Sequence, residues 1–517
     1  MEPTATDQVR AAEVIASMCL ATDLGMGFPF EHGLHATLTT MRLCEILDVD
    51  QDTMSRTYYA CLLMYAGCTV DGVERSQVFG GSMTEHHTHR QFGSTIESLT
   101  GVMRALPSPD ASMPARAIQS VTGLPRAARF KRGHLAALCE VAGMLAERLG
   151  VPPAVHEMFP LLVERWDGGS VLKRAGGDDI PLPLRIIHVG RDATYQRLIG
   201  DDDHVRSVIA SRAGHAFDPK VATVFLDNAS EILGPREPSE TTWEDVLASE
   251  PRPWLTLKGP AIDQALGAIG AFSDLVSPHL SGHCSGVAQL ASAAAGLSGF
   301  PPVEVEKMRR AGFVHDVGRT AIATRVWEKS GPLTAHEREQ VRLHPYHTDR
   351  VLARSPFLAE LAPIAMAHHE RLDGSGYHRG LDSSSLSRGA RLLAVADAFR
   401  SKTEHRPYRE ALSPKKTAEV LAGKAREGLF DPVMVMAVAE AAGEAAPTID
   451  RPAGLTEREA EVLGLLARGL QTKQMARELD ISAKTVDRHI QNSYRKIGVS
   501  SRAAATLFAT ENGLVSR

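Results

Sequence analysis

Apolar residues recur along most of this chain at intervals of three and four, the spacing that places them on one face of an α-helix. The pattern is clear in VAQLASAAAGL (287–297) and in VLARSPFLAELAPIAMAH (351–368). Aromatic residues make up only 5% of the sequence, and Ala and Leu are abundant. We therefore expect an all-α protein.

Two stretches rich in Pro, Gly and charge interrupt the helical pattern, at residues 233–254 and 443–454. Such stretches predict linkers. They divide the chain into residues 1–250, 256–442 and 452–517, and 517 residues are enough for about three domains with packed cores.

The first two of these parts share a repeated pattern. ERWDGGS (164–170) matches ERLDGSG (370–376), and the same offset pairs RIIHVG (185–190) with RLLAVA (391–396). We call residues 1–250 the first copy and residues 256–442 the second copy. HATLTTMRLCEIL (35–47) aligns with HCSGVAQLASAAAGL (283–297) at a different offset. The counterpart of His315 then falls near Tyr65, which predicts about 44 extra residues in the first copy before Glu164, near positions 70–125.

Charge and cysteine content indicate the kind of partner that the tail suits and the cellular compartment of the protein. The net charge is −5, but residues 451–517 hold 11 Lys/Arg against 7 Asp/Glu, so the tail alone is basic and is the part suited to a polyanion. No run reaches the roughly 18 apolar residues that a membrane span needs, and the first residues lack the layout of a secretory signal. The six cysteines form no CxxC pair. We expect a cytoplasmic protein without disulfides.

One motif in the second copy suggests chemistry. In AGFVHDVGRTAI (311–322), His315 and Asp316 stand side by side within an apolar run. Such a pair is either a hydrogen-bonded polar pair at a helix end or part of a metal site in which the aspartate bridges two ions. The second interpretation requires more ligands, and the second copy offers them in order: His283, His344, His368, His369 and Asp397.

These residues, with the loop DGSGYH (373–378), resemble the HD-GYP phosphodiesterases over about residues 256–440. Members of this branch of the HD superfamily hydrolyse cyclic di-GMP at a centre of two or three iron or manganese ions. The resemblance implies one ion held by His283, His315, Asp316 and Asp397 and a second held by His344, His368 and His369, with Asp316 bridging. His279 lies on the helical face of His283 and is either a ligand of a third ion or a surface histidine.

The same resemblance implies roles for three arginines. Asp316 and Arg319 would be the catalytic residues, and Arg319, Arg406 and Arg409 would bind the substrate phosphates, for which a planar and permanently charged guanidinium is suited. Each arginine could instead be a solvated side chain. Two departures from the family pattern put the substrate in doubt: His378 stands where proline is usual, and Arg400 replaces a common aspartate.

The first copy lacks most of these ligands. In the sequence alignment His35 pairs with His283 and has Glu31 four residues before it. Tyr65–Ala66 pairs with the His-Asp dipeptide, Leu162–Val163 with the His-His pair, and Arg191 with Asp397. Asp192 is either a remnant ligand or a sign of a register error. We expect a degenerate HD domain without a catalytic metal, serving as a sensor, a dimerisation surface or a packing partner. The cluster EHHTH (85–89) predicts a solvated loop rather than a metal site.

The tail has its own signals. Thr456 and Glu459 form a Thr-x-x-Glu capping box, and the periodicity that follows predicts four helices separated by short breaks, the parts of a helix-turn-helix. The tail resembles the LuxR-type DNA-binding domain. By that resemblance the recognition helix spans about residues 483–496, Arg488 and Gln491 face bases, and the residues facing phosphates are Lys473, Lys484, Thr485 and Lys496. Asp487 stands where lysine is common and could alter specificity.

Two functions from different classes follow. The chain is either a phosphodiesterase whose tail places it on double-stranded DNA, or a transcription regulator that uses the HD-GYP site as a pocket for a cyclic dinucleotide. The same ligands could also support hydrolysis of another nucleotide or an iron-dependent oxygenation. Because LuxR-type domains commonly bind two half-sites, we expect a homodimer.

Overall fold

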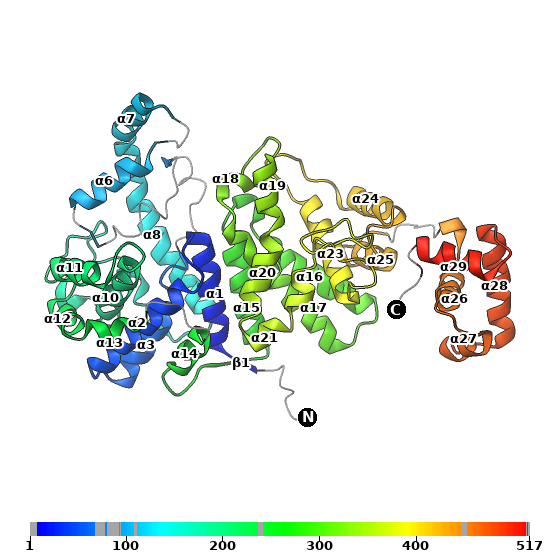
Figure 1. Cartoon of the computed structure of the whole chain (residues 1–517), viewed down its shortest axis with the longest axis horizontal. Helices are drawn as coiled ribbons and strands as arrows, with labels where there is room; N and C mark the ends of the chain where they lie inside the picture. The colour runs from blue at the N-terminus through cyan, green and yellow to red at the C-terminus, as the bar shows by residue number, and fades with distance from the viewer. Residues whose placement is uncertain are drawn as a thin grey trace. The chain divides into compact units, whose positions relative to one another are not determined.

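The computed structural model of this chain is almost entirely helical (Figure 1). It describes residues 8–67, 78–79, 92–93, 95–107, 111–235, 241–445, 452–512 and 514. Two short strands, β1 (Gln8–Arg10) and β2 (Thr256–Lys258), pair antiparallel with Val9 opposite Leu257. The all-α prediction is confirmed. No helix among the described residues is both long enough and apolar enough to span a membrane.

The chain divides into two compact units. The first contains the described residues up to Cys284 together with Asp316–Ala362, and the second contains Ser285–His315 and the described residues from Pro363 onward. In the first copy the helices of the first unit are α1 (Ala11–Met26), α2 (His32–Ile46), α3 (Gln51–Leu63), α6 (Thr95–Ala105), α7 (Met113–Thr122), α8 (Leu124–Arg148), α9 (Pro153–His156), α10 (Leu182–Gln196), α11 (Asp202–Arg212), α12 (Pro219–Asp227), α13 (Ala229–Leu233) and α14 (Thr242–Ala248), with the 3-10 turns η3 (Phe159–Leu161) and η4 (Gly177–Asp179).

Local sequence sets where several of these helices begin and end. Asp50 caps α3 by accepting a hydrogen bond from the Thr53 amide at 2.9 Å, and Asp218 caps α12 through the Lys220 amide at 2.8 Å. An acceptor side chain at this position satisfies one of the free amides of the first turn. At the other end of α1, Gly27 takes a left-handed conformation (φ 68°), which glycine adopts without a steric cost.

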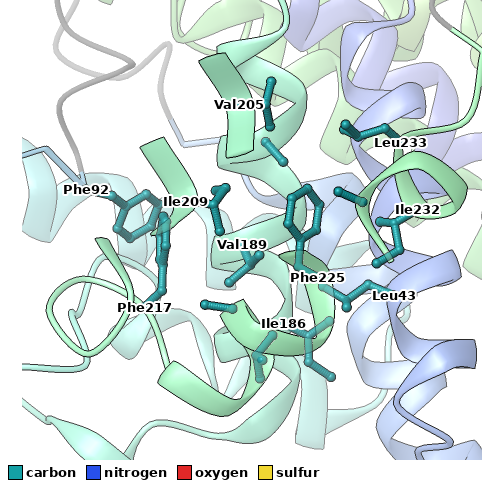
Figure 2. Close-up of a cluster of buried hydrophobic side chains, with 14 of the residues drawn as sticks. Leu43, Phe92, Ile186, Val189, Val205, Ile209, Phe217, Phe225, Ile232 and Leu233 are labelled. Carbon is teal, nitrogen blue, oxygen red and sulfur yellow. The ribbon is translucent and has the colours of Figure 1, made fainter. Parts of the chain in front are cut away.

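A continuous apolar core holds the first copy together. α2 packs against α3 and α10, and Figure 2 shows how side chains from α2, α10, α11, α12 and α13 converge. Phe92 packs on Phe217 with ring centroids 5.3 Å apart. Ten labelled side chains of this cluster are at most 3% exposed: Leu43, Phe92, Ile186, Val189, Val205, Ile209, Phe217, Phe225, Ile232 and Leu233.

The first unit also contains part of the second copy: α15 (Pro260–Asp274), η5 (Pro278–Leu280), η6 (Val317–Ala321), α18 (Thr324–Trp327), α19 (Ala335–Arg342), α20 (His344–Leu352) and α21 (Pro356–Ala359). Here η6 packs closely on α20. A Cβ atom at Gly318 would lie 2.1 Å from the carbonyl oxygen of His344, and the Gly318 amide donates to Thr348 Oγ1 at 3.0 Å. Only glycine allows this approach.

The second unit contains most of α16 (His283–Leu297), α17 (Pro302–Val314), α23 (Arg388–Thr403), α24 (Pro414–Arg426) and α25 (Pro432–Ala441). α22 (Ala362–Ala365) lies where the two units meet in the sequence. The tail begins at η7 (Pro452–Gly454) and continues with α26 (Glu457–Ala467), α27 (Thr472–Glu478), α28 (Ala483–Ile497) and α29 (Arg502–Glu511). These four helices enclose their own core, which includes Val462, Met475 and Val486.

Helix bounds reveal how the two copies correspond. α2 and α16 have equal lengths, and so do α3 and α17. The number of residues from the start of α2 to the start of α16 equals the number from the start of α3 to the start of α17. We call this number of residues the α2–α16 offset. α23 follows α10 at a shorter offset. The difference between these two offsets is close to the number of extra residues that the sequence predicts in the first copy. These extra residues fall between α3 and the later part of α8.

Candidate metal centre

Asp316 lies between two histidines in the first unit. The residue directly precedes η6 and is fully buried. Its Oδ2 atom is 3.4 Å from His283 Nε2 at the start of α16, and its Oδ1 atom is 3.3 Å from His344 Nε2 at the start of α20. A carboxylate with one oxygen toward each of two imidazoles is placed as a bridging ligand requires.

Asp397 has the same relation to two other histidines in the second unit. It lies in α23, where Oδ1 is 3.9 Å from His315 Nε2 and Oδ2 is 3.9 Å from His369 Nδ1. His368 packs edge-on against His315, with ring centroids 4.9 Å apart. The His315–Asp316 peptide bond joins the two carboxylate-centred groups, so the dipeptide noticed in the sequence belongs to both.

Hydrogen bonds fix the tautomers of three of these histidines. The Nδ1 atoms of His315, His344 and His368 lie 2.8, 2.5 and 2.6 Å from the carbonyl oxygens of the residues three positions earlier. Because a carbonyl can only accept, each Nδ1 carries the proton and each Nε2 keeps a lone pair. This backbone partner is the outer-shell arrangement that orients metal-binding histidines.

The side chains form two groups, each with all its ligand atoms within 4.8 Å of one another: His283, His315, Asp316 and Asp397 in one, and His344, His368 and His369 in the other. These are the two ligand sets that the resemblance implied. Two ligands about 2.1 Å from one ion lie roughly 3.0–3.4 Å apart, which is close to the spacing around Asp316. The donor set, its burial and its tautomers fit divalent metal ions.

Arg319, expected to contact phosphate, lies on the carboxylate of Asp316, the predicted bridging ligand. Its Nη2 atom is 2.7 Å from Asp316 Oδ2, and the guanidinium carbon lies 5.4 Å from the centre of the Trp327 ring. Trp327 also packs edge-on against His344, at 6.1 Å between ring centroids. The indole therefore contacts both a predicted ligand and the predicted catalytic arginine, a role that no sequence signal indicated.

Arg406 and Arg409 lie on one tight turn, where each backbone amide donates to the carbonyl of the other at 2.9 and 3.0 Å. The Arg406 guanidinium pairs with Glu404 at 2.7 Å, and that of Arg409 donates to the Ser401 carbonyl. Arg400 pairs with the other oxygen of Glu404 at 3.0 Å. Contact of Arg406 and Arg409 with a substrate phosphate remains a prediction.

His279 has a carboxylate neighbour. Its Nε2 atom lies 3.7 Å from Glu328 Oε2, and Glu328 also accepts a hydrogen bond from Ser277. Two side chains do not complete a metal site, so a third ion at His279 remains a prediction. The sequence interpretation missed Glu328 because it is distant from His279 along the chain.

Three further side chains support the predicted ligands. Asp274 accepts a hydrogen bond from the Cys284 amide at 3.2 Å, next to His283, and burial raises the pKa of its carboxyl to about 6. Tyr377 stacks on His369 with centroids 4.7 Å apart. The buried carboxylate of Glu370 accepts from the amides of Arg379 and Leu381 at 2.8 and 2.9 Å, which holds the loop that contains His378.

The structure corrects two pairings between the copies. Since α2 and α16 begin at His32 and His283, the counterpart of His283 is His32. Asp23 accepts from the Gly33 amide at 3.1 Å as Asp274 accepts from Cys284, and these two pairs are also related by the α2–α16 offset. The prediction of His35 is therefore wrong by three residues: α2 carries histidines at both 32 and 35, and apolar periodicity alone does not distinguish the two registers.

The second correction concerns the His-Asp dipeptide. The α2–α16 offset pairs it with Met64–Tyr65, so the predicted pairing with Tyr65–Ala66 is wrong by one residue. A Cβ at Gly67 would lie 2.1 Å from the Leu138 carbonyl oxygen, just as one at Gly318 would meet that of His344. Leu138 thus occupies the place of His344.

An arginine occupies the corresponding centre of the first copy. The Arg191 guanidinium carbon lies 3.5 Å from the centre of the Tyr65 ring, and both residues are 5% exposed. Phe28 packs on Tyr65 and on His32, with centroids 5.3 and 4.5 Å apart. Burial, and then the nearby guanidinium, lowers the pKa of His32 to about 3. We call Phe28, His32, Tyr65 and Arg191 the arginine cluster.

Asp192, the other carboxylate considered in the first copy, pairs with the buried Arg212 at 2.6 Å. It belongs to an ion pair and not to a remnant metal site. Within the described part of the chain, the first copy contains no group of three or more metal-ligating side chains. The EHHTH cluster (85–89) lies outside the described residues.

The tail forms the predicted helix-turn-helix. The Thr456–Glu459 capping box is present, and the expected recognition helix corresponds to α28. Four predicted contacts, Lys473, Lys484, Arg488 and Gln491, are exposed, and Thr485 is partly buried. Lys496 is bound at 2.7 Å to Glu459. Asp487 accepts from Thr472 Oγ1 at 3.2 Å and thereby connects α27 to α28.

Comparison with known families agrees with both parts of this description. Residues 272–434 match the HD domain family, and residues 453–509 match the bacterial regulatory proteins of the luxR family. The chain thus contains an HD domain followed by a LuxR-type domain, as the sequence predicted.

Individual relatives agree with the first of these matches. The chain is 24% identical over 414 residues to 3'3'-cGAMP-specific phosphodiesterase 3 of Vibrio cholerae, covering 79% of this chain and 90% of that protein. It is 36% identical to a cyclic di-GMP phosphodiesterase of Thermotoga maritima, over 30% of this chain and 42% of that one. The crystal structure of a cyclic GMP-AMP specific phosphodiesterase of V. cholerae covers 84% of this chain and 98% of its own, with a TM-score of 0.58 at 22% identity, and so shares its fold.

Proposed function

We propose that this chain, which carries an HD domain and a LuxR-type domain, is a metal-dependent phosphodiesterase of cyclic dinucleotides that also binds DNA. One observation carries the proposal: the second copy retains both ligand groups, with three histidines held in the tautomer that binds metal. The relatives named above act on cyclic dinucleotides, which supports this substrate class. The LuxR-type domain supports a site of action on chromosomal DNA in the cytoplasm.

Different residues of the site would have different roles in the proposed hydrolysis. Divalent ions in this site, iron or manganese by resemblance, would acidify a water and neutralise charge on the phosphodiester. Asp316 would hold two ions together, and the Nδ1 hydrogen bonds would keep the histidines oriented. Arg319, which contacts Asp316 and lies beside the Trp327 ring, would supply positive charge to a phosphate oxygen.

Two cyclic dinucleotides are candidate substrates. Cyclic di-GMP agrees with the HD-GYP resemblance, while the extent of the match to the 3'3'-cGAMP-specific protein of V. cholerae favours 3'3'-cGAMP as the second candidate. The altered loop at His378 lies beside the stacked pair of Tyr377 and His369 and would contribute to the choice between guanine and adenine.

Metal content and turnover of both dinucleotides test the enzymatic proposal. The protein is purified without oxygen and compared with Asp316→Ala. Two ions per chain in the wild type, turnover of a cyclic dinucleotide, and loss of both in the variant would support a hydrolase. Bound metal without turnover, but with a dinucleotide changing DNA affinity, would favour a ligand-gated regulator. Product analysis would detect hydrolysis of another nucleotide or an oxygenation.

The DNA-binding proposal has a separate test. Arg488 is exposed on α28, where an arginine can donate two hydrogen bonds to guanine. We expect Arg488→Ala to weaken binding to a selected operator by about 1–3 kcal/mol and binding to bulk DNA much less. Lys473→Ala is the matched control, since loss of a phosphate contact weakens both equally. Equal losses for Arg488→Ala on both DNAs would contradict base recognition.

We further propose that the protein acts as a homodimer, because two helix-turn-helix domains are needed to read two half-sites. Mass measurement at micromolar concentration with operator DNA tests this. A complex containing one protein chain would overturn it.

A further inference from the structure

The first copy contacts the segment that carries Asp316, Arg319 and His344. Within the first unit, α1 packs against η6 and α20. Thr320 Oγ1, one residue after Arg319, donates to the Ala21 carbonyl at 3.0 Å. Ser355 Oγ, just beyond α20, donates to Glu13 Oε2 at 2.7 Å. Both ends of this segment are therefore bound to α1.

A second set of contacts holds the later part of α20. Arg354 pairs with Glu31 at 2.5 Å, and the guanidinium carbon of Arg350 lies 4.1 Å from the centre of the Phe30 ring. The Glu31 side chain is 8% exposed and that of Arg354 is 39% exposed. A nearly buried carboxylate that loses its partner is costly, so this pair constrains α20 more than a surface ion pair would.

The backbone of Glu31 shows that its side chain matters. Glu31 has φ 75° and gives no capping hydrogen bond to α2. Its counterpart in the second copy, at the α2–α16 offset, is Gly282 with φ 76°. This conformation is natural for glycine and costs a side-chain-bearing residue about 1 kcal/mol or more. The carboxylate of the residue that bears this cost contacts Arg354.

We propose that Glu31 is a positioning residue for the metal centre: through Arg354 it fixes α20, and thereby sets His344 against Asp316. The first copy would then act on the centre as a structural partner. This inference rests on the proposed function only in assigning the centre to metal.

The path from Glu31 to the ligands is short and rigid. Arg354 follows α20 by two residues, and His344 begins that helix. Thr348, one turn after His344, accepts from the Gly318 amide, and Gly318 stands two residues after Asp316. A shift of α20 would therefore change the 3.3 Å separation of His344 Nε2 and Asp316 Oδ1.

Titration of the full-length, metal-free protein with Mn²⁺ alone tests the proposal. We expect Glu31→Gly and Arg354→Ala each to weaken binding of one ion about fivefold, and the double variant to lose no more than either single variant. Arg354→Lys, which keeps the charge, should recover part of the affinity. Glu31→Gly is the sharpest variant because it relieves the backbone, so its thermal midpoint should not fall while its Mn²⁺ affinity does.

Arg197→Ala is the matched control, since it removes an arginine–carboxylate pair with Asp202, at 2.9 Å, elsewhere in the first copy. It should lower the thermal midpoint and leave Mn²⁺ affinity unchanged. Affinities of Glu31→Gly and Arg354→Ala within twofold of the wild type would overturn the proposal, as would an equal loss in Arg197→Ala.

Amide hydrogen exchange of residues 344–352 without metal separates the two proposals. Faster exchange in Glu31→Gly would support the positioning role of Glu31 even if the wild type bound no Mn²⁺, an outcome that would contradict the metal centre alone. Unchanged exchange in this segment would overturn the positioning role even if the wild type bound two ions and hydrolysed a cyclic dinucleotide.

Discussion

The two copies build opposite centres on matching helices. In the second copy, the buried carboxylates of Asp316 and Asp397 lie among histidines, and burying a carboxylate without a compensating cation or hydrogen bond is costly. In the first copy, Arg191 replaces Asp397 and stands on the Tyr65 ring, while Leu138, Leu162 and Val163 stand in place of three histidines. At the position of Asp397 the first copy thus carries a permanent cation in place of a carboxylate, and the difference teaches that matching helices can support buried centres of opposite charge.

The largest effect is expected from placing an arginine at the equivalent position of the second copy, Asp397. Asp397→Arg would remove a carboxylate from between His315 and His369 and add a cation, so it should abolish binding of at least one ion. Loss of metal stabilisation of about 4 kcal/mol corresponds to a roughly 1,000-fold fall in phosphodiester turnover. Metal analysis and turnover on the same preparation measure the effect.

Asp397→Asn provides the control for size, since it keeps the shape of the side chain and removes its charge. It should retain more metal than Asp397→Arg. Full metal content in Asp397→Arg would show that Asp397 is not a ligand.

The reciprocal change, Arg191→Asp, should not create a metal site, because the neighbouring positions offer aliphatic side chains in place of ligands. It would leave an unpaired carboxylate among buried aromatic rings, and we expect a loss of about 3 kcal/mol in the free energy of unfolding. Urea unfolding of the full chain and metal analysis measure the two outcomes.

Arg191→Met fills similar space without charge and should cost less, about 2 kcal/mol, for the lost cation–π contact. If Arg191→Asp gained an ion, the first copy would be a latent metal site and the contrast between the copies would rest on one residue.

Much of the fold and of the candidate site could be predicted from the sequence, because the signals involved act between residues close together along the chain. Helical periodicity and the capping box at Thr456 act within a few residues, so the all-α fold and the limits of α28 were predicted closely. The ligand groups were also predicted, because their histidines and aspartates form a distinctive pattern that can be matched to the HD-GYP family.

What failed or was missed depends on contacts between distant residues. α2 carries histidines at both 32 and 35, and only the helix starts and the Asp23 and Asp274 hydrogen bonds identified His32 rather than His35 as the counterpart of His283. Trp327 ends α18 and Glu328 follows it, and they contact His344 and His279, which are distant from them along the chain. Arg191 was noticed as a missing ligand, whereas its contact with Tyr65 joins residues that are far apart along the chain.

A smaller effect is expected at a buried histidine of the first copy. Desolvation lowers the pKa of His188 to about 3, and its Nε2 donates to the Leu162 carbonyl at 3.0 Å. The unfolded chain takes up a proton near pH 6.5, but folded His188 does not. Its contribution to stability is therefore present above pH 6.5 and is lost as the pH falls toward 3.

His188→Gln keeps a donor near Leu162 and removes the titration. Wild type should have a larger free energy of unfolding than this variant at pH 7. The difference should narrow by about 2 kcal/mol at pH 5, because only in the wild type does the unfolded chain then bind a proton that the folded chain does not. Urea unfolding of both proteins at the two pH values, without metal, gives the comparison. A constant difference would mean that His188 titrates alike in the folded and unfolded chains, and that the first copy does not keep this imidazole neutral by burial.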